Sequence, residues 1–104
     1  MNVNRRIAES LIALNSPVRC HIVGIGGPGM SAIARLLLEM GHVVTGSDLH
    51  HSEVIEELCQ RGATISIGHQ ATAVHGADVV TYSTAIPSNN VELAEAQRSG
   101  IETR

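Results

Sequence analysis

Apolar residues between positions 18 and 62 switch between short continuous runs and helical spacing. An apolar run at 20–25 precedes a glycine-rich turn, and a second run at 43–45 follows Gly41. Between the two runs, an apolar face repeats at i, i+3, i+4 and i+7, formed by Ile33, Leu36, Leu37 and Met40. Two runs joined by a helix within about 30 residues predict a βαβ unit with a right-handed crossover. We expect Gly41 to end the helix.

The same alternation continues to the end of the chain. Ser52 is placed to cap a helix whose inward side chains include Val54, Ile55 and Leu58. The later predicted elements are a strand at 64–67, a short helical turn at 71–74, a strand at 78–84, a helix at 89–99 and a strand that begins at Ile101. Apolar strands alternating with helices predict an α/β fold. We expect a Rossmann-like doubly wound parallel sheet of four to five buried strands in a three-layer αβα arrangement.

Residues 1–17 lie outside this alternation and are predicted to form a lead-in helix. Apolar side chains recur at helical spacing over residues 4–15, and Asn15, Ser16 and Pro17 end the pattern. Residues 18–104 then form one domain, because 104 residues are too few for two cores. The fifth strand begins where the chain stops, so we expect this domain to come from a longer protein.

Charge and composition narrow the classes of partner. All seven basic residues are arginines scattered along the chain, and the net charge is −3, so a nucleic-acid partner is not expected. The absence of lysine excludes the P-loop lysine and Schiff-base chemistry. No apolar run matches a bilayer span and no secretory signal opens the chain, so we expect a cytoplasmic protein without a membrane partner. Cys20 and Cys59 are expected to be reduced, buried thiols.

The histidines and nucleophiles show no arrangement typical of a catalytic or metal centre. The six histidines have neither zinc-like spacing with cysteine nor a HExxH motif. No nucleophile lies beside a base at a recognisable spacing. We therefore expect no metal site, no catalytic residue and no cofactor within this domain.

The glycine-rich turn is the main candidate site. Residues 24–29, Gly-Ile-Gly-Gly-Pro-Gly, match the pattern G-x-G-x-x-G between a predicted strand and a predicted helix. Such a turn brings bare backbone and the amides of a helix N-terminus close to an anion. The pattern indicates a diphosphate site, and a purely structural glycine turn is the alternative.

Other candidate residues lie at the carboxyl ends of the later strands, the edge at which open α/β sheets bind ligands. Asp48 ends the second strand 19 residues after Gly29, where dinucleotide folds place an acid that accepts hydrogen bonds from a ribose. A carboxylate repels phosphate, so a nucleoside is its expected partner, and a helix cap or turn former is the alternative. The segment Ser83-Thr84-Ala85-Ile86 offers two hydroxyls to phosphate, unless it only finishes a strand. His69 follows the third strand at this edge, where a solvated loop histidine is the alternative.

A more specific match covers residues 21–31, HIVGIGGPGMS, which resembles the opening of the Mur ligases. Further matches follow in order at residues 46–48, 68–69, 76–80, 83–86 and 90, so the resemblance covers the chain from about Val18 to its end. Pro28 stands where the family more often has alanine, and offers no N–H to a diphosphate. Thr84 stands where serine is more common, and it keeps the hydroxyl.

The resemblance implies an N-terminal domain that binds the UDP part of UDP-N-acetylmuramate. An ATPase domain and a C-terminal domain, both absent from this chain, would follow in the full-length ligase. That ligase would use ATP and Mg²⁺ to activate the muramoyl carboxylate as an acyl phosphate in peptidoglycan synthesis, and the domain alone would be inactive. Its expected partners are UDP-N-acetylmuramate or UDP and the remaining domains. The implied ligand-binding residues are Gly26, Gly27, Pro28, Gly29, Met30, Ser31, Asp48, Leu49, His69, Ser83, Thr84, Ala85 and Ile86.

Other functions fit some of the same residues. Family members that add L-alanine match best, but those that attach a recycled tripeptide to the same nucleotide share the loop, and the acceptor site lies outside this domain. The glycine loop and Asp48 would serve equally well in an NAD(P)-binding oxidoreductase domain, and a non-enzymatic nucleotide-sensing module is a third class. The Gly26-Gly27 pair with Met30-Ser31, and the segment 83–86, favour the ligase.

Overall fold

The computed structural model describes residues 9–11, 13 and 16–104. Residues 9–11 are helical, and most of the predicted lead-in helix at 1–17 lies outside the described residues. Leu11 is fully buried in a core cluster, and Arg104 Nη1 donates a hydrogen bond to the Ser10 carbonyl oxygen at 3.1 Å. The described part of this segment therefore packs onto the domain and contacts the last residue of the chain.

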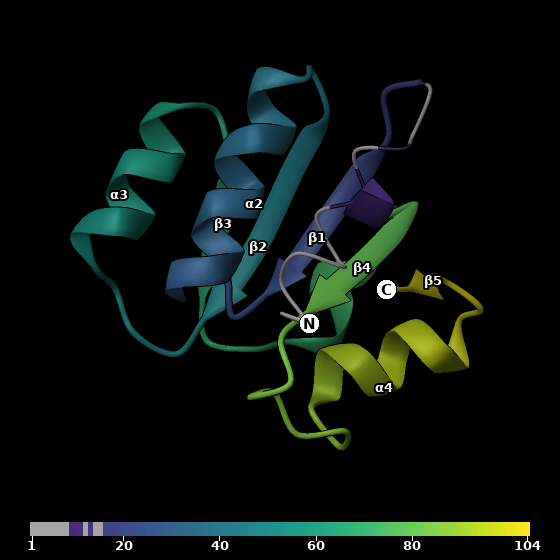
Figure 1. Cartoon of the computed structure of the whole chain (residues 1–104). Helices are drawn as coiled ribbons and strands as arrows, with labels where there is room; N and C mark the ends of the chain where they lie inside the picture. Colours follow the sequence, from purple (N-terminus) through teal and green to yellow (C-terminus); the bar gives the residue numbers. More distant parts are fainter. Residues whose placement is uncertain (1–8, 12, 14–15) are drawn as a thin grey trace.

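A five-stranded sheet in the order β3-β2-β1-β4-β5 forms the centre of the domain, and all adjacent strands are parallel (Figure 1). The strands are β1 (Arg19–Val23), β2 (Val43–Asp48), β3 (Thr64–Ile67), β4 (Val79–Tyr82) and β5 (Glu102–Thr103). The direction of winding reverses at β1, which lies between β2 and β4. The predicted doubly wound parallel sheet is confirmed, and ligands of such sheets bind outside the carboxyl ends of the strands at this reversal.

Helices cover both faces of the sheet (Figure 1). One face carries α2 (Pro28–Glu39) and α3 (Glu53–Gln60), and the other carries α4 (Val91–Arg98) and the 3₁₀ helix η1 (Ala71–Val74). The first core cluster joins Ile33 of α2 to Leu58 of α3, whereas the second joins Val74 of η1 to Leu93 of α4. The domain therefore has the three layers expected from the sequence.

Strand β1 contributes to both cores because successive side chains of a strand point to opposite faces. Cys20 and Ile22 pack in the cluster with α2 and α3, whereas Val23 packs in the cluster with α4. His21 is 1% exposed and its Nε2 lies 2.7 Å from a carboxylate oxygen of Glu92 on α4. A polar ring thus lies within the second core.

The inward face of α2 differs from the predicted one. Its buried apolar side chains are Met30, Ile33, Ala34 and Leu37, whereas Met40 is 38% exposed. The helix ends at Glu39 and Met40 is its C-cap, so the buried stripe begins one turn earlier than the sequence pattern indicates.

Two further expectations on burial are wrong. Cys59 is exposed, because its neighbour Leu58 takes the inward position on α3. Strand β3 is largely exposed, because it lies at the edge of the sheet.

Strand β4 and helix α4 are also shorter at both ends than predicted, and β5 begins at Glu102 instead of Ile101. Among the described residues, no helix is both long enough and apolar enough to span a membrane.

Candidate functional site

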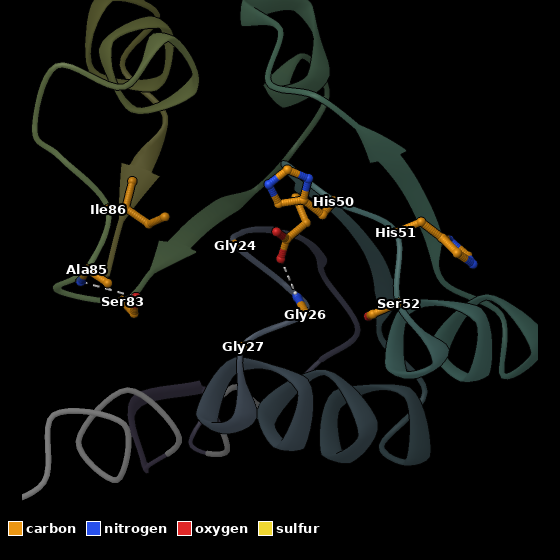
Figure 2. Close-up of a pocket in the computed structure, with 10 residues that line it drawn as sticks. Gly24, Gly26, Gly27, His50, His51, Ser52, Ser83, Ala85 and Ile86 are labelled. Atoms are coloured by element: carbon orange, nitrogen blue, oxygen red, sulfur yellow. Dashed lines mark hydrogen bonds between the residues drawn. The ribbon is translucent and has the colours of Figure 1, made fainter.

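A cavity of about 390 Å³ opens at the carboxyl edge of the sheet, where the winding reverses (Figure 2). Three segments surround it: the glycine loop after β1, the turn after β2 and the turn after β4. The lining residues are Gly24, Gly26, Gly27, Asp48, His50, His51, Ser52, Ser83, Ala85 and Ile86. Segments that are far apart in the sequence therefore form one concave surface at the place where α/β sheets bind ligands.

The glycine loop is anchored to the end of β2 by its own amides. Gly24 adopts φ +78° and ends β1 two residues earlier than predicted. The N–H groups of Gly24 and Ile25 both donate to the Ser47 carbonyl oxygen, at 2.8 and 3.0 Å. Gly26 N–H donates to Asp48 Oδ2 at 2.8 Å, and Gly27 N–H donates to the Gly24 carbonyl oxygen at 3.2 Å. The first four amides of the loop thus have partners within the protein, three at the end of β2 and one in the loop.

The first turn of α2 supplies the amides that the loop does not use. Pro28 begins the helix and has no N–H, so Gly29 and Met30 are the next donors. Amides in the first turn of a helix have no carbonyl partner within the helix, and the helix dipole makes this end attractive to anions. The first turn contains no acidic residue. An anion beside this turn would be met by two free donors and by no opposing carboxylate from the turn.

Positions 26 and 27 differ in the room that the fold leaves for a side chain. A Cβ atom on Gly26 would lie 2.9 Å from Asp48 Oδ2, so a side chain there would displace the carboxylate that holds the loop. A Cβ atom on Gly27 would meet only the Gly24 carbonyl oxygen, at an ordinary 3.5 Å. Gly27 has φ −65° and ψ 152°, a conformation open to any residue. A side chain at position 26 would therefore disturb the contact between Asp48 and the loop, whereas position 27 has room for one.

Asp48 uses both carboxylate oxygens within the protein. Oδ2 accepts the Gly26 amide and Oδ1 accepts the Leu49 amide, both at 2.8 Å, and the Asp48 carbonyl oxygen accepts the Gly68 amide at 2.7 Å. The bond to Leu49 matches the turn-forming alternative, whereas the bond to Gly26 was not predicted. Asp48 remains partly exposed on the cavity. Leu49 follows it with 62% of its surface exposed.

The turn after β4 forms the opposite wall of the cavity (Figure 2). Ser83 Oγ accepts the Ala85 amide at 3.3 Å, and the Ser83 carbonyl oxygen accepts the Ile86 amide at 3.1 Å. The Ser83 hydroxyl hydrogen is left to donate. Ser83, Ala85 and Ile86 line the cavity as expected, but Thr84 is not among its lining residues.

The remaining predicted residues do not line the cavity: Pro28, Gly29, Met30, Ser31, Leu49 and His69. The side chains of Met30 and Ser31 are buried, and the Ser31 hydroxyl donates to the Pro28 carbonyl oxygen at 3.1 Å. His69 Nδ1 lies 2.9 Å from Ser47 Oγ. Sequence reasoning missed His50, His51 and Ser52 as lining residues, although their place directly after β2 at the carboxyl edge was a usable signal.

A buried polar cluster behind the cavity was also missed. Glu92 of α4 is 0% exposed, and its Oε1 accepts from His21 Nε2 at 2.7 Å and from the Ser47 hydroxyl at 2.6 Å. Its Oε2 accepts the Gln70 amide at 2.9 Å. Burial raises the pKa of Glu92, but the hydrogen bonds from His21, Ser47 and Gln70 outweigh burial and hold this pKa below its ordinary value. Glu92 is therefore an ionised carboxylate inside the second core.

Among the described residues, no group of three or more histidine, cysteine, aspartate or glutamate side chains is arranged to hold a metal ion. The acidic side chains near the cavity are instead committed to backbone and histidine donors. The chemistry that this surface offers is hydrogen bonding: helix amides and a serine hydroxyl for an anion, with carboxylate and imidazole groups at one side.

Comparison with known proteins gives consistent matches. The family model described as "Mur ligase family, catalytic domain" matches residues 19–104. The chain is 57% identical, over 89 residues, to the UDP-N-acetylmuramate–L-alanine ligase of Chlorobium phaeovibrioides, covering 85% of this chain and 19% of that protein. The chain thus spans about a fifth of the length of the relatives that it matches.

Two solved structures are similar to the domain. The UDP-N-acetylmuramate–alanine ligase of Thermotoga maritima has a TM-score of 0.79 and 31% identity, over 83% of this chain and 20% of that one. A murein peptide ligase of Psychrobacter arcticus has a TM-score of 0.78 and 28% identity, over 84% of this chain and 18% of that one. Both matches concern one domain of a larger protein.

Proposed function

Because the chain belongs to the Mur ligase family, we propose that it is the UDP-N-acetylmuramate-binding domain of an ATP-dependent ligase that adds L-alanine to this nucleotide. The observation that carries the proposal is the cavity at the sheet reversal, which Gly24, Gly26 and Gly27 of the glycine loop line. The first turn of α2, with its free Gly29 and Met30 amides, follows directly after these residues. The names of the most similar relatives support the choice of nucleotide and of L-alanine.

In this proposal, the diphosphate lies against the glycine loop and the first turn of α2. Gly27 leaves open space, the Gly29 and Met30 amides donate, and the Ser83 hydroxyl donates from the opposite wall. The nucleoside extends over the end of β2 toward Asp48, Leu49 and His69. This orientation keeps the Asp48 carboxylate away from the phosphates, which it would repel.

The full-length ligase supplies the remaining parts of the reaction. ATP and Mg²⁺ would activate the muramoyl carboxylate as an acyl phosphate, and the amino acid would displace the phosphate in the domains outside this chain. The proposal places no catalytic residue in this domain, which would bind the nucleotide in the cytoplasm but would not turn it over alone.

Attachment of a tripeptide to the same nucleotide is the second candidate, favoured by the match to a murein peptide ligase at nearly the same TM-score. The acceptor does not reach this domain in either case, so the domain alone does not separate the two. Release of phosphate by the full-length protein with L-alanine or with the tripeptide, each with ATP and UDP-N-acetylmuramate, distinguishes them. We expect turnover with L-alanine, and turnover only with the tripeptide would replace the proposal.

Calorimetry on this chain tests nucleotide binding directly. Titrations with UDP, NADH and ATP should show binding of UDP and no binding of NADH, together with no hydrolysis of ATP. NADH binding without UDP binding would favour the oxidoreductase alternative. Binding of ATP in preference to UDP would favour a nucleotide-sensing module.

A further inference from the structure

Glu92 connects one helix to three segments that shape the site. From α4 its carboxylate contacts β1 through His21, β2 through Ser47 and the loop after β3 through the Gln70 amide. Ser47 is itself 0% exposed, and its carbonyl oxygen holds the Gly24 and Ile25 amides of the glycine loop. The carboxylate therefore bonds the hydroxyl of the same residue whose carbonyl oxygen anchors the proposed diphosphate loop.

The hydrogen bonds of this cluster determine where its protons lie. An ionised carboxylate only accepts, so the single hydroxyl hydrogen of Ser47 is donated to Glu92 Oε1 at 2.6 Å. Ser47 Oγ must then accept from His69, whose Nδ1 lies at 2.9 Å. Glu92 Oε2 lies 3.6 Å from the same Nδ1, and its negative charge also favours a proton on that nitrogen. A neutral His69 in this position carries its proton on Nδ1.

We propose that Glu92 is a positioning residue of the site: by orienting the Ser47 hydroxyl it fixes neutral His69 in the Nδ1–H tautomer and leaves Nε2 as a hydrogen-bond acceptor. Nε2 has no hydrogen-bond partner within the part of the chain that the structure describes. An acceptor recognises a hydroxyl or a ring N–H and disfavours a phosphate oxygen. His69 would thus contact the nucleoside part of the ligand. This contact rests on the proposed function, whereas the assignment of the tautomer does not.

The tautomer is measured first, without ligand. Long-range ¹H–¹⁵N NMR spectra of the chain at about pH 8 distinguish the two neutral forms of each histidine, since the protonated and bare ring nitrogens resonate far apart. We expect His69 with its proton on Nδ1, and loss of this preference in Glu92→Gln and in Ser47→Ala. Glu95→Gln is the matched control on the same helix, because Glu95 contacts His75 and not His69. A wild-type His69 with its proton on Nε2 would overturn the proposal even if neither variant folds.

The affinity for UDP is measured second. Loss of one hydrogen bond between neutral groups corresponds to about a 2- to 10-fold change in affinity, so Glu92→Gln should weaken UDP binding by about that factor while Glu95→Gln leaves it unchanged. A folded Glu92→Gln variant with wild-type UDP affinity and an altered His69 tautomer would overturn the positioning role. If wild-type protein shows the Nδ1–H tautomer but binds no UDP, the proposed nucleotide function fails and the tautomer assignment stands.

Discussion

Replacement of Asp48 by alanine is expected to weaken the binding of both UDP and inorganic pyrophosphate. From the sequence alone, the expected partner of Asp48 is a nucleoside, so a loss confined to UDP is the prediction. The structure changes this expectation, because Asp48 Oδ2 holds the Gly26 amide at 2.8 Å. Without the carboxylate, the loop must be ordered again whenever a diphosphate binds.

The size of the effect follows from the contacts that are lost. A hydrogen bond to a charged group contributes about 1.5–3 kcal/mol, and each 1.4 kcal/mol corresponds to about tenfold in affinity. Asp48 is partly exposed, so the lower end of that range applies to the bond with Gly26. Pyrophosphate affinity should fall about tenfold. UDP affinity should fall further, by about 10- to 100-fold in total, if the carboxylate also accepts from the nucleoside.

The chain offers a matched control for this experiment. Asp78 is the other aspartate, and its Oδ2 accepts the Arg19 amide at 2.8 Å, at the opposite edge of the sheet. Asp78→Ala should lower the melting temperature about as much as Asp48→Ala does and leave both affinities unchanged. Calorimetry with each ligand gives the two affinities of each variant, and thermal unfolding gives its melting temperature. A folded Asp48→Ala variant with unchanged pyrophosphate affinity would refute the role of Asp48 in holding the loop.

Four further predictions follow from particular contacts. Gly27→Val should keep the melting temperature but weaken UDP and pyrophosphate binding, because the valine Cβ fits the fold while its two methyl groups enter the space proposed for the diphosphate. Unchanged affinity in calorimetry would exclude the loop as the diphosphate site. Pro28→Ala adds an N–H at the start of α2 and should strengthen pyrophosphate binding by up to about tenfold in the same assay. Burial raises the pKa of Cys20 to about 12, so a thiol reagent should modify only exposed Cys59 in the native protein, and both cysteines after unfolding. Hydrogen bonds from Arg98 and His75 lower the pKa of Glu95 from 4.5 to about 2, so the stability that its carboxylate contributes is present above pH 4.5 and is lost as the pH falls through about 2. Over this pH range, the melting temperature of the wild type should therefore fall more than that of Glu95→Gln.

The order of elements was predictable because it depends on local patterns. Apolar runs, helical spacing and the glycines between them placed all five strands to within a few residues. The glycine loop could be located for the same reason, since the pattern at residues 24–29 specifies a turn between a strand and a helix. What the local pattern did not show is which face of a helix is inward, as Met40 and Cys59 illustrate.

The buried polar cluster was not predictable in this way. Glu92 lies early in a polar helix, where a glutamate is usually solvated, and its partner His21 is 71 residues away in the sequence. The bond between Asp48 and Gly26 likewise joins residues 22 apart whose pairing depends on the register of β1 and β2. Such contacts arise only once the sheet is assembled, so they require the tertiary structure.

The end of β2 shows why ligand contact and loop support are difficult to separate at this site. Ser47 and Asp48 are consecutive, so their side chains point to opposite faces of the sheet, Ser47 toward Glu92 and Asp48 toward the glycine loop. Their carbonyl oxygens hold further amides, those of Gly24 and Ile25 at Ser47 and that of Gly68 at Asp48. Two residues therefore set the geometry of two loops and of one buried cluster. A substitution at either position changes the shape of the site before it removes any contact with a ligand, and only ligands that share the diphosphate but differ in the nucleoside distinguish the two effects.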